Sequence, residues 1–97
     1  MSIQQLMWAT AYIKDGHTLS DSLVYAMSEL GELSDEIMIV EGKSDREAGV
    51  DGVVGEAVDV IVCMLDIIHK ADPTVCENDI VNIAKAKIKK WQSKAGA

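Results

Sequence analysis

Two short acidic motifs, both set in apolar sequence, constrain this chain of 97 residues more than any other feature. The first is Glu29-x-x-Glu32 and the second is Glu56-x-x-Asp59. Residues three apart on a helix are neighbours, so each motif would point two carboxylates to one side of its helix. If the two helices pack together, four carboxylates meet in one small volume.

The segment around the second motif predicts a buried helix. Between residues 57 and 68 the only polar side chains are Asp59 and Asp66. A helix that is apolar on nearly every side is buried, and a buried carboxylate is costly unless something positive meets it. The β-branched residues of this segment also suit a strand. Its length, without alternation or internal turn residues, favours the helix.

The composition predicts a single all-α domain over residues 1–97. The chain has no Phe, one Pro and no hairpin dipeptides, and it is rich in Ala, Leu, Ile, Met, Glu and Lys. Four helices account for it, over about residues 3–14, 20–42, 44–70 and 74–91. Residues 44–47 and 74–77 read as capping boxes that open the last two helices. Gly49, Gly52 and Gly55 leave a second possibility, a loop that continues to about Gly52.

The apolar pattern also predicts inner faces and an assembly. The inner faces are Leu6, Met7, Thr10 and Ile13 on the first helix, Leu23, Met27, Leu30, Ile37 and Val40 on the second, and Ile80, Ala84, Ile88 and Trp91 on the last. Hydrophobic residues make up 48% of the chain, which is high for so small a domain. We therefore expect a helical-bundle homo-oligomer, either a dimer or a dimer of dimers.

The charge distribution restricts the partners. The formal net charge of −7 argues against nucleic acid, which proteins bind chiefly through Lys and Arg. Residues 85–97 nevertheless carry five lysines and no acid, so the last helix is the basic element. The N-terminal sequence lacks a basic leader and no stretch is long enough to span a membrane. We expect a cytoplasmic protein without a membrane partner.

A central antiparallel hairpin of the second and third helices would bring the two motifs together. With the turn near Ser44, Glu32 lies opposite Glu56 and Glu29 lies opposite Asp59. Oxygen ligands without an accompanying His or Cys suit a hard divalent ion, Mg²⁺ first and Mn²⁺ second. These four carboxylates are the predicted metal ligands.

Three further residues near the motifs need an interpretation. Glu36 and Asp66 extend the acidic stripes, and we interpret each as partly exposed or salt-bridged rather than as a ligand. Gly31, between the two glutamates of the first motif, lowers helix stability. Either the close approach of a neighbouring helix or ligand, or simple tolerance, would explain it.

With these motifs the chain resembles the MazG-like all-α nucleoside triphosphate pyrophosphatases, whose hallmark is Glu-x-x-Glu on one helix and Glu-x-x-Asp on the next. Residues 30–33 and 55–59 carry the resemblance, which covers about residues 17–91. It implies Mg²⁺-dependent hydrolysis of (deoxy)nucleoside triphosphates between the α and β phosphates, giving a monophosphate and pyrophosphate. Such small relatives suggest a housecleaning role that removes noncanonical or surplus nucleotides.

Catalytic and substrate-binding residues can be assigned on this basis. Mg²⁺ would neutralise the phosphates and activate a water, whose proton a carboxylate such as Glu32 could accept. Glu56 is the other candidate catalytic residue. Substrate-binding candidates are Asn82, Lys85 and Lys89, which share one face of the last helix, and Trp8.

The resemblance makes Lys85 the first choice for a phosphate contact and Lys89 the second. It also suggests that Trp8 stacks on a base, although a tryptophan commonly fills a core or an interface.

Two other functions remain open from the sequence. Phosphoribosyl-ATP pyrophosphatase shares this acidic arrangement, and only its substrate separates it from the first hypothesis. A non-enzymatic helical dimerisation or interaction module, in which the acids are structural, belongs to a different class.

Overall fold

A computed structural model of the chain describes residues 1–13 and 16–96, and all the regular secondary structure in these residues is helical. The elements are α1 (Ile3–Ile13), α2 (Leu19–Val40), α3 (Gly52–Ala71) and α4 (Glu77–Ala95). The predicted all-α class with four helices is confirmed. Lys14 and Asp15, where we expected the first helix to end, lie outside the described residues.

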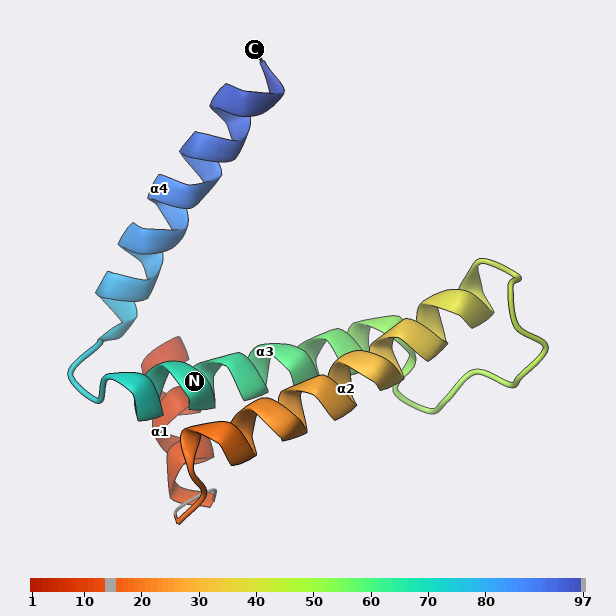
Figure 1. The fold of residues 1–97 in the computed structure, drawn as a ribbon, viewed down its shortest axis with the longest axis horizontal. Helices are drawn as coiled ribbons and strands as arrows, with labels where there is room; N and C mark the ends of the chain where they lie inside the picture. Colours follow the sequence, from red (N-terminus) through yellow and green to blue (C-terminus); the bar gives the residue numbers. More distant parts are fainter. Residues whose placement is uncertain (14–15, 97) are drawn as a thin grey trace.

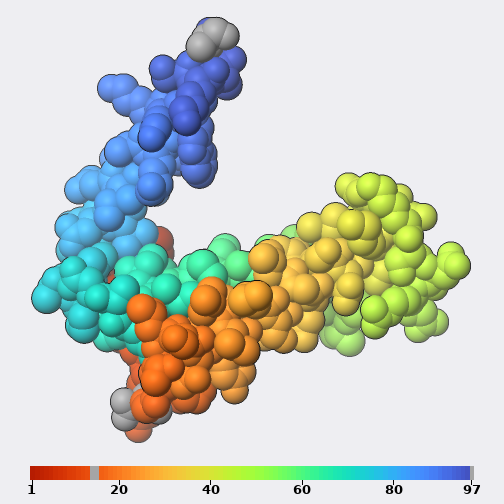
Figure 2. Space-filling model, in the orientation of Figure 1, coloured from red at the N-terminus to blue at the C-terminus, as the bar shows by residue number. Residues whose placement is uncertain are grey.

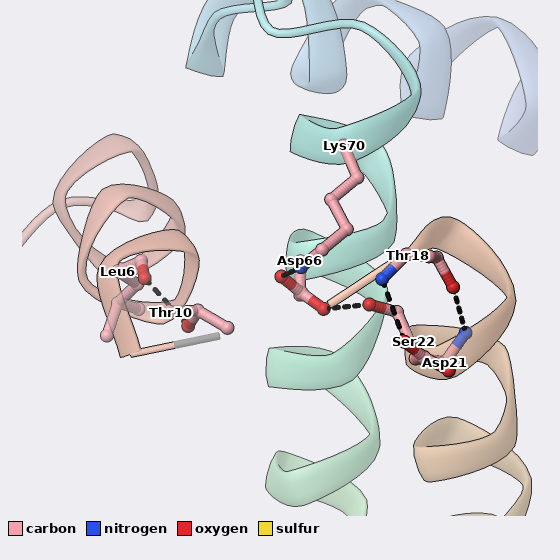
Figure 3. Close-up of polar contacts among 7 residues, drawn as sticks. All are labelled: Leu6, Thr10, Thr18, Asp21, Ser22, Asp66 and Lys70. Atoms are coloured by element: carbon pink, nitrogen blue, oxygen red, sulfur yellow. Dashed lines mark hydrogen bonds and ion pairs between the residues drawn. The ribbon is translucent and has the colours of Figure 1, made fainter. Parts of the chain in front are cut away.

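The start of α2 is fixed by a capping box that the sequence analysis missed. The Thr18 side chain accepts a hydrogen bond from the Asp21 backbone N–H, and the Asp21 carboxylate accepts one from the Thr18 N–H (Figure 3). This reciprocal pair satisfies two N–H groups that a helix N-terminus otherwise leaves open. It also positions the first turn of α2, which carries Ser22.

The two predicted capping boxes are wrong. The hydroxyl of Ser44 accepts from the Arg46 N–H within a loop, and α3 begins only at Gly52, as the glycine-rich alternative suggested. For α4 the N-cap residue is Cys76, which exchanges capping hydrogen bonds with Asp79. In both regions the pattern of the box recurs by chance in a turn, where side chains bond to nearby backbone N–H groups.

Three helices form the body of the molecule (Figure 1). α2 and α3 pack side by side along their length and run in opposite directions. α1 packs against the C-terminal end of α3. α4 extends away from this body, and its residues 81–95 are all exposed (Figure 2). The radius of gyration is 15.8 Å, larger than the ~13 Å of a compact domain of this length.

The interior of the single chain is small. Its buried apolar side chains, within the described residues, are Met7, Ala26, Cys63 and Leu65. The interior also contains a polar contact between two helices: Ser22 on α2 donates a hydrogen bond to the fully buried Asp66 on α3 (Figure 3). Lys70, one turn further along α3, pairs with the other carboxylate oxygen. The salt-bridge interpretation of Asp66 is therefore confirmed.

The predicted inner face of α2 is wrong for the single chain. Leu23, Met27 and Leu30 are 53%, 63% and 55% exposed, whereas Ser22 and Ala26 face α3 and are buried. Small side chains allow two helices to approach closely, and Ser22 also supplies the donor that Asp66 needs. On α1 the buried residues are Met7 and Thr10, as predicted, but Leu6 and Ile13 are exposed.

The expected inner face of α4 is likewise open. Ile88 is 48% exposed and Trp91 is 63% exposed, because within residues 1–13 and 16–96 no other helix packs over them. Among the residues that the structure describes, no helix is both long enough and apolar enough to cross a membrane.

Candidate functional site

The packing of α2 on α3 brings the two acidic motifs into one cluster. Glu29 and Glu32 come from α2, and Glu56 and Asp59 come from α3. One carboxylate oxygen of each side chain lies within 4.8 Å of those of the other three. The structure thus places together all four residues that the sequence predicts as metal ligands.

The four carboxylates differ in their access to solvent. Glu29, Glu56 and Asp59 are half-buried, and Glu32 is exposed. The Oε2 atom of Glu56 is fully buried and has no hydrogen-bond partner. A buried, unpartnered carboxylate oxygen is costly, so this atom is well suited to a cation.

The surroundings of Glu56 disfavour the ionised form of its carboxyl group. Burial, followed by the negative charges of Glu32 and Asp59, raises the pKa of Glu56 to about 7. Asp51 at the start of α3 acts in the same direction. Like charges held close together disfavour ionisation, and a bound cation would reverse this effect.

A polar cavity of about 220 Å³ adjoins the cluster and shares Glu32 and Glu56 with it. Its other walls are formed by α2 and by the loop between α2 and α3, from Asp35, Glu36, Ile39, Arg46, Glu47 and Gly49. The cavity contains one cationic side chain, Arg46, which forms an exposed ion pair with Asp35. The space beside the acidic cluster is therefore open to a small polar ligand.

Glu36 holds the loop against this cavity. Its Oε1 atom accepts a hydrogen bond of 2.6 Å from the Gly49 N–H, and its side chain is buried, with a relative exposure of 8%. The interpretation of Glu36 as a partly exposed or salt-bridged residue is wrong. A Cβ atom at residue 49 would lie only 2.5 Å from Glu36 Oε1, so glycine allows the backbone to approach this carboxylate.

The structure does not bring the predicted substrate-binding residues of α4 to the cluster. Asn82, Lys85 and Lys89 lie on the exposed part of α4, which extends away from α2 and α3 (Figures 1 and 2). Trp8 lies on α1 and is 57% exposed. In one chain, therefore, the acidic and the basic elements of the predicted site are separate.

Sequence reasoning missed Arg46 as a residue near the site, and it named Glu36 without its contact to the loop. Arg46 was assigned to a helix that does not begin until six residues later. The three nearby glycines were the available signal, because they favour a loop that could fold back over the acidic motifs.

The cluster fits a divalent cation by its donor set. Four carboxylates from two rigid helices supply only oxygen ligands, which Mg²⁺ and Mn²⁺ prefer. Comparisons of the chain with models of protein families, with curated proteins and with solved structures found no match.

Proposed function

We propose that this chain is a Mg²⁺-dependent nucleoside triphosphate pyrophosphohydrolase of the MazG-like type. The observation that supports it most directly is the convergence of Glu29, Glu32, Glu56 and Asp59 from two helices within 4.8 Å. The chain would cleave (deoxy)nucleoside triphosphates to a monophosphate and pyrophosphate as part of cytoplasmic nucleotide housecleaning. It would act as a homo-oligomer, a dimer or a dimer of dimers.

In this proposal the four carboxylates bind the Mg²⁺ ion, and Glu32 also acts as the general base. Bound Mg²⁺, or Mn²⁺ in its place, would offset the phosphate charge and lower the pKa of a water. Glu32 is the exposed member of the cluster, so it can accept the proton of the water that attacks the α-phosphorus. The new bond joins that water oxygen to phosphorus, and the bond to the pyrophosphate oxygen breaks. Glu56 would be a metal ligand whose pKa is raised to about 7 in the absence of the ion.

The remaining residues would position the substrate. Lys85 and Lys89 suit phosphate oxygens as point charges, and Asn82 suits a phosphate or a ribose hydroxyl. Trp8 offers an exposed indole for stacking on the base. These roles require that α4 and α1 of the assembly approach the acidic cluster.

The test is pyrophosphate release from a panel of nucleoside triphosphates and phosphoribosyl-ATP, with and without Mg²⁺. We expect release that depends on Mg²⁺, and its substrate profile separates the two enzyme classes. Glu56→Gln, which is nearly isosteric, should abolish turnover and leave the helical content intact. Glu41→Gln, at an exposed carboxylate beyond the end of α2, is the matched control and should retain activity. Full activity of Glu56→Gln would remove the cluster from the proposed mechanism.

The many exposed apolar side chains favour a second candidate, a non-enzymatic interaction module. The two functions differ in their response to metal. An ion bound to the folded state raises the melting temperature by mass action. If the acids are only structural, millimolar Mg²⁺ would leave the melting temperature unchanged and no substrate in the panel would be cleaved.

A further inference from the structure

The polar cavity beside the acidic cluster has in its wall a buried carboxylate that is only half satisfied. Glu36 lines this cavity and is more than nine-tenths buried. Its Oε1 atom accepts the hydrogen bond from the Gly49 N–H, whereas its Oε2 atom is buried and has no hydrogen-bond partner. Because a buried, unpartnered carboxylate oxygen is costly, Glu36 requires a positive group. It is not one of the four carboxylates of the cluster, so it requires a cation of its own.

The charges around the cavity also favour a cation. Five carboxylates and one guanidinium line it, and the guanidinium is already paired with one of the carboxylates. Glu32 and Glu56 belong to the cluster as well. The other two carboxylates are Glu36 on α2 and Glu47 in the loop of residues 41–51, and neither forms an ion pair in the part of the chain that the structure describes. An anionic or apolar occupant is therefore disfavoured.

The size of the cavity indicates the kind of cation. Its volume of about 220 Å³ is that of about seven water molecules in the liquid, at about 30 Å³ each. Among the described residues, the cluster is the one group of acidic side chains whose oxygens all meet within 4.8 Å, so the cavity offers fewer direct ligands. Mg²⁺ keeps several of its waters and is usually bound through one or two carboxylates. A partly hydrated Mg²⁺ ion fits both observations.

We propose that this cavity is a second divalent-cation site, in which Glu36 binds a partly hydrated Mg²⁺ ion directly and Glu47 binds it through water. Since Glu36 lies on α2 and Glu47 lies in the loop, the ion would join these two elements. It would act together with the hydrogen bond from the Gly49 N–H, which already holds the loop to the same carboxylate. The site does not depend on the proposed nucleotide hydrolysis, in which neither Glu36 nor Glu47 takes part.

Counting bound ions tests the site without an activity assay. Mn²⁺ is the probe, because it prefers the same oxygen ligands as Mg²⁺ and its free form is measured by electron paramagnetic resonance. We expect two Mn²⁺ ions per chain for the wild type, both displaced by excess Mg²⁺, and one for Glu36→Gln. Glu41→Gln, at an exposed carboxylate outside the cavity, is the matched control and should bind two. Fewer than two ions in the wild type, or two in Glu36→Gln, would overturn the proposal.

Amide hydrogen exchange of residues 41–51 tests whether the ion joins the loop to α2. At a Mg²⁺ concentration ten times the Kd of the site, exchange in the loop should be about ten-fold slower for the wild type and for Glu41→Gln. For Glu36→Gln, the same Mg²⁺ concentration should change the exchange rate by less than about two-fold. In EDTA, Glu36→Gln should exchange as the wild type does, because its side-chain carbonyl can still accept from the Gly49 N–H. Exchange in the wild-type loop that is independent of Mg²⁺ would contradict the proposed link.

Asp59→Asn separates the proposed ion from an ion in the cluster. Asp59 is a member of the cluster but does not line the cavity. Mg²⁺ should therefore still slow exchange in the loop of Asp59→Asn, although the cluster of this variant binds its own ion more weakly. If Asp59→Asn loses the slowing as Glu36→Gln does, an ion in the cluster orders the loop and the second site is refuted. The ion count and the exchange of the wild type need no variant, so they test the proposal even where a variant fails to fold.

Discussion

Glu56 on α3 faces Glu32 on α2, and carboxylate oxygens of the two side chains lie within 4.8 Å of each other. This proximity, added to the burial of Glu56, raises the pKa of Glu56 to about 7. Near neutral pH the metal-free cluster therefore retains a proton that an exposed glutamate would have lost.

This proton makes the stability of the metal-free chain depend on pH. Between about pH 4.5 and pH 7 the folded state binds a proton on Glu56 that the unfolded state has released. The free energy of unfolding should therefore fall as pH rises through this window and level off above it. Urea unfolding in EDTA, at fixed protein concentration, measures this slope.

Glu56→Gln should flatten the slope, and Glu41→Gln should keep it. The comparison isolates Glu56 from carboxylates such as Asp21, Asp72 and Asp79, whose pKa values are lowered by hydrogen bonds and which titrate at more acidic pH. If the free energy of unfolding depends on pH in the same way for wild type and Glu56→Gln, the proton is bound by another group.

Much of the fold could be predicted from the sequence, because the formation of a helix and the spacing of acids along it depend on residues close together in the chain. The long apolar segment around Asp59 excluded a strand, and the motif spacing placed each pair of acids on one side of its helix. The register that pairs Glu32 with Glu56 also pairs Ser22 with Asp66, which are hydrogen-bonded in the structure. Local pattern therefore sufficed for the helical type of the elements, whereas the cluster also needed the antiparallel register of α2 and α3, and the starts of α3 and α4 were predicted wrongly from their capping boxes.

The faces of the helices could not be predicted in the same way. Hydrophobic spacing selected Leu23, Met27 and Leu30 as the inner face of α2, but Ser22 and Ala26 are the residues that pack on α3. Periodicity identifies an apolar face without distinguishing the core of one chain from an interface between chains. The loop up to Gly52 was one of the two possibilities, but its contact between Glu36 and Gly49 was missed for another reason, since that contact joins residues 13 apart in sequence.

The hydrogen bond from Ser22 to Asp66 should contribute measurably to stability. Ser22→Ala leaves one oxygen of a fully buried carboxylate without its donor, so the free energy of unfolding should fall by about 1–2 kcal/mol. Ser28→Ala, at an exposed serine of the same helix, should change it by less than about 0.5 kcal/mol. Urea unfolding at fixed protein concentration measures both. Equal changes in the free energy of unfolding for the two variants would show that the ion pair with Lys70 stabilises the buried Asp66 carboxylate without the Ser22 hydrogen bond.

The contact between Glu36 and Gly49 should control the opening of the loop beside the cavity. Glu36→Ala removes the acceptor of the Gly49 N–H, and a loss of about 1 kcal/mol corresponds to about five-fold faster trypsin cleavage after Arg46. Glu36→Gln keeps a carbonyl acceptor and should resemble the wild type.

Asp35→Ala is the matched control for this loop. It removes only an exposed ion pair of 3.6 Å with Arg46, and such pairs contribute little. Its cleavage rate should stay within about two-fold of the wild type. Wild-type cleavage of Glu36→Ala would mean that other contacts hold the loop.

Gly31, between the two glutamates of the first motif, has open space where a Cβ atom would be, with nothing within 4 Å in the single chain. Gly31→Ala should therefore raise the free energy of unfolding by about 0.5–1 kcal/mol through helix propensity alone. Urea unfolding measures this gain, and sedimentation shows whether assembly is preserved. A loss of stability together with a loss of assembly would instead show that a second chain approaches Gly31 closely.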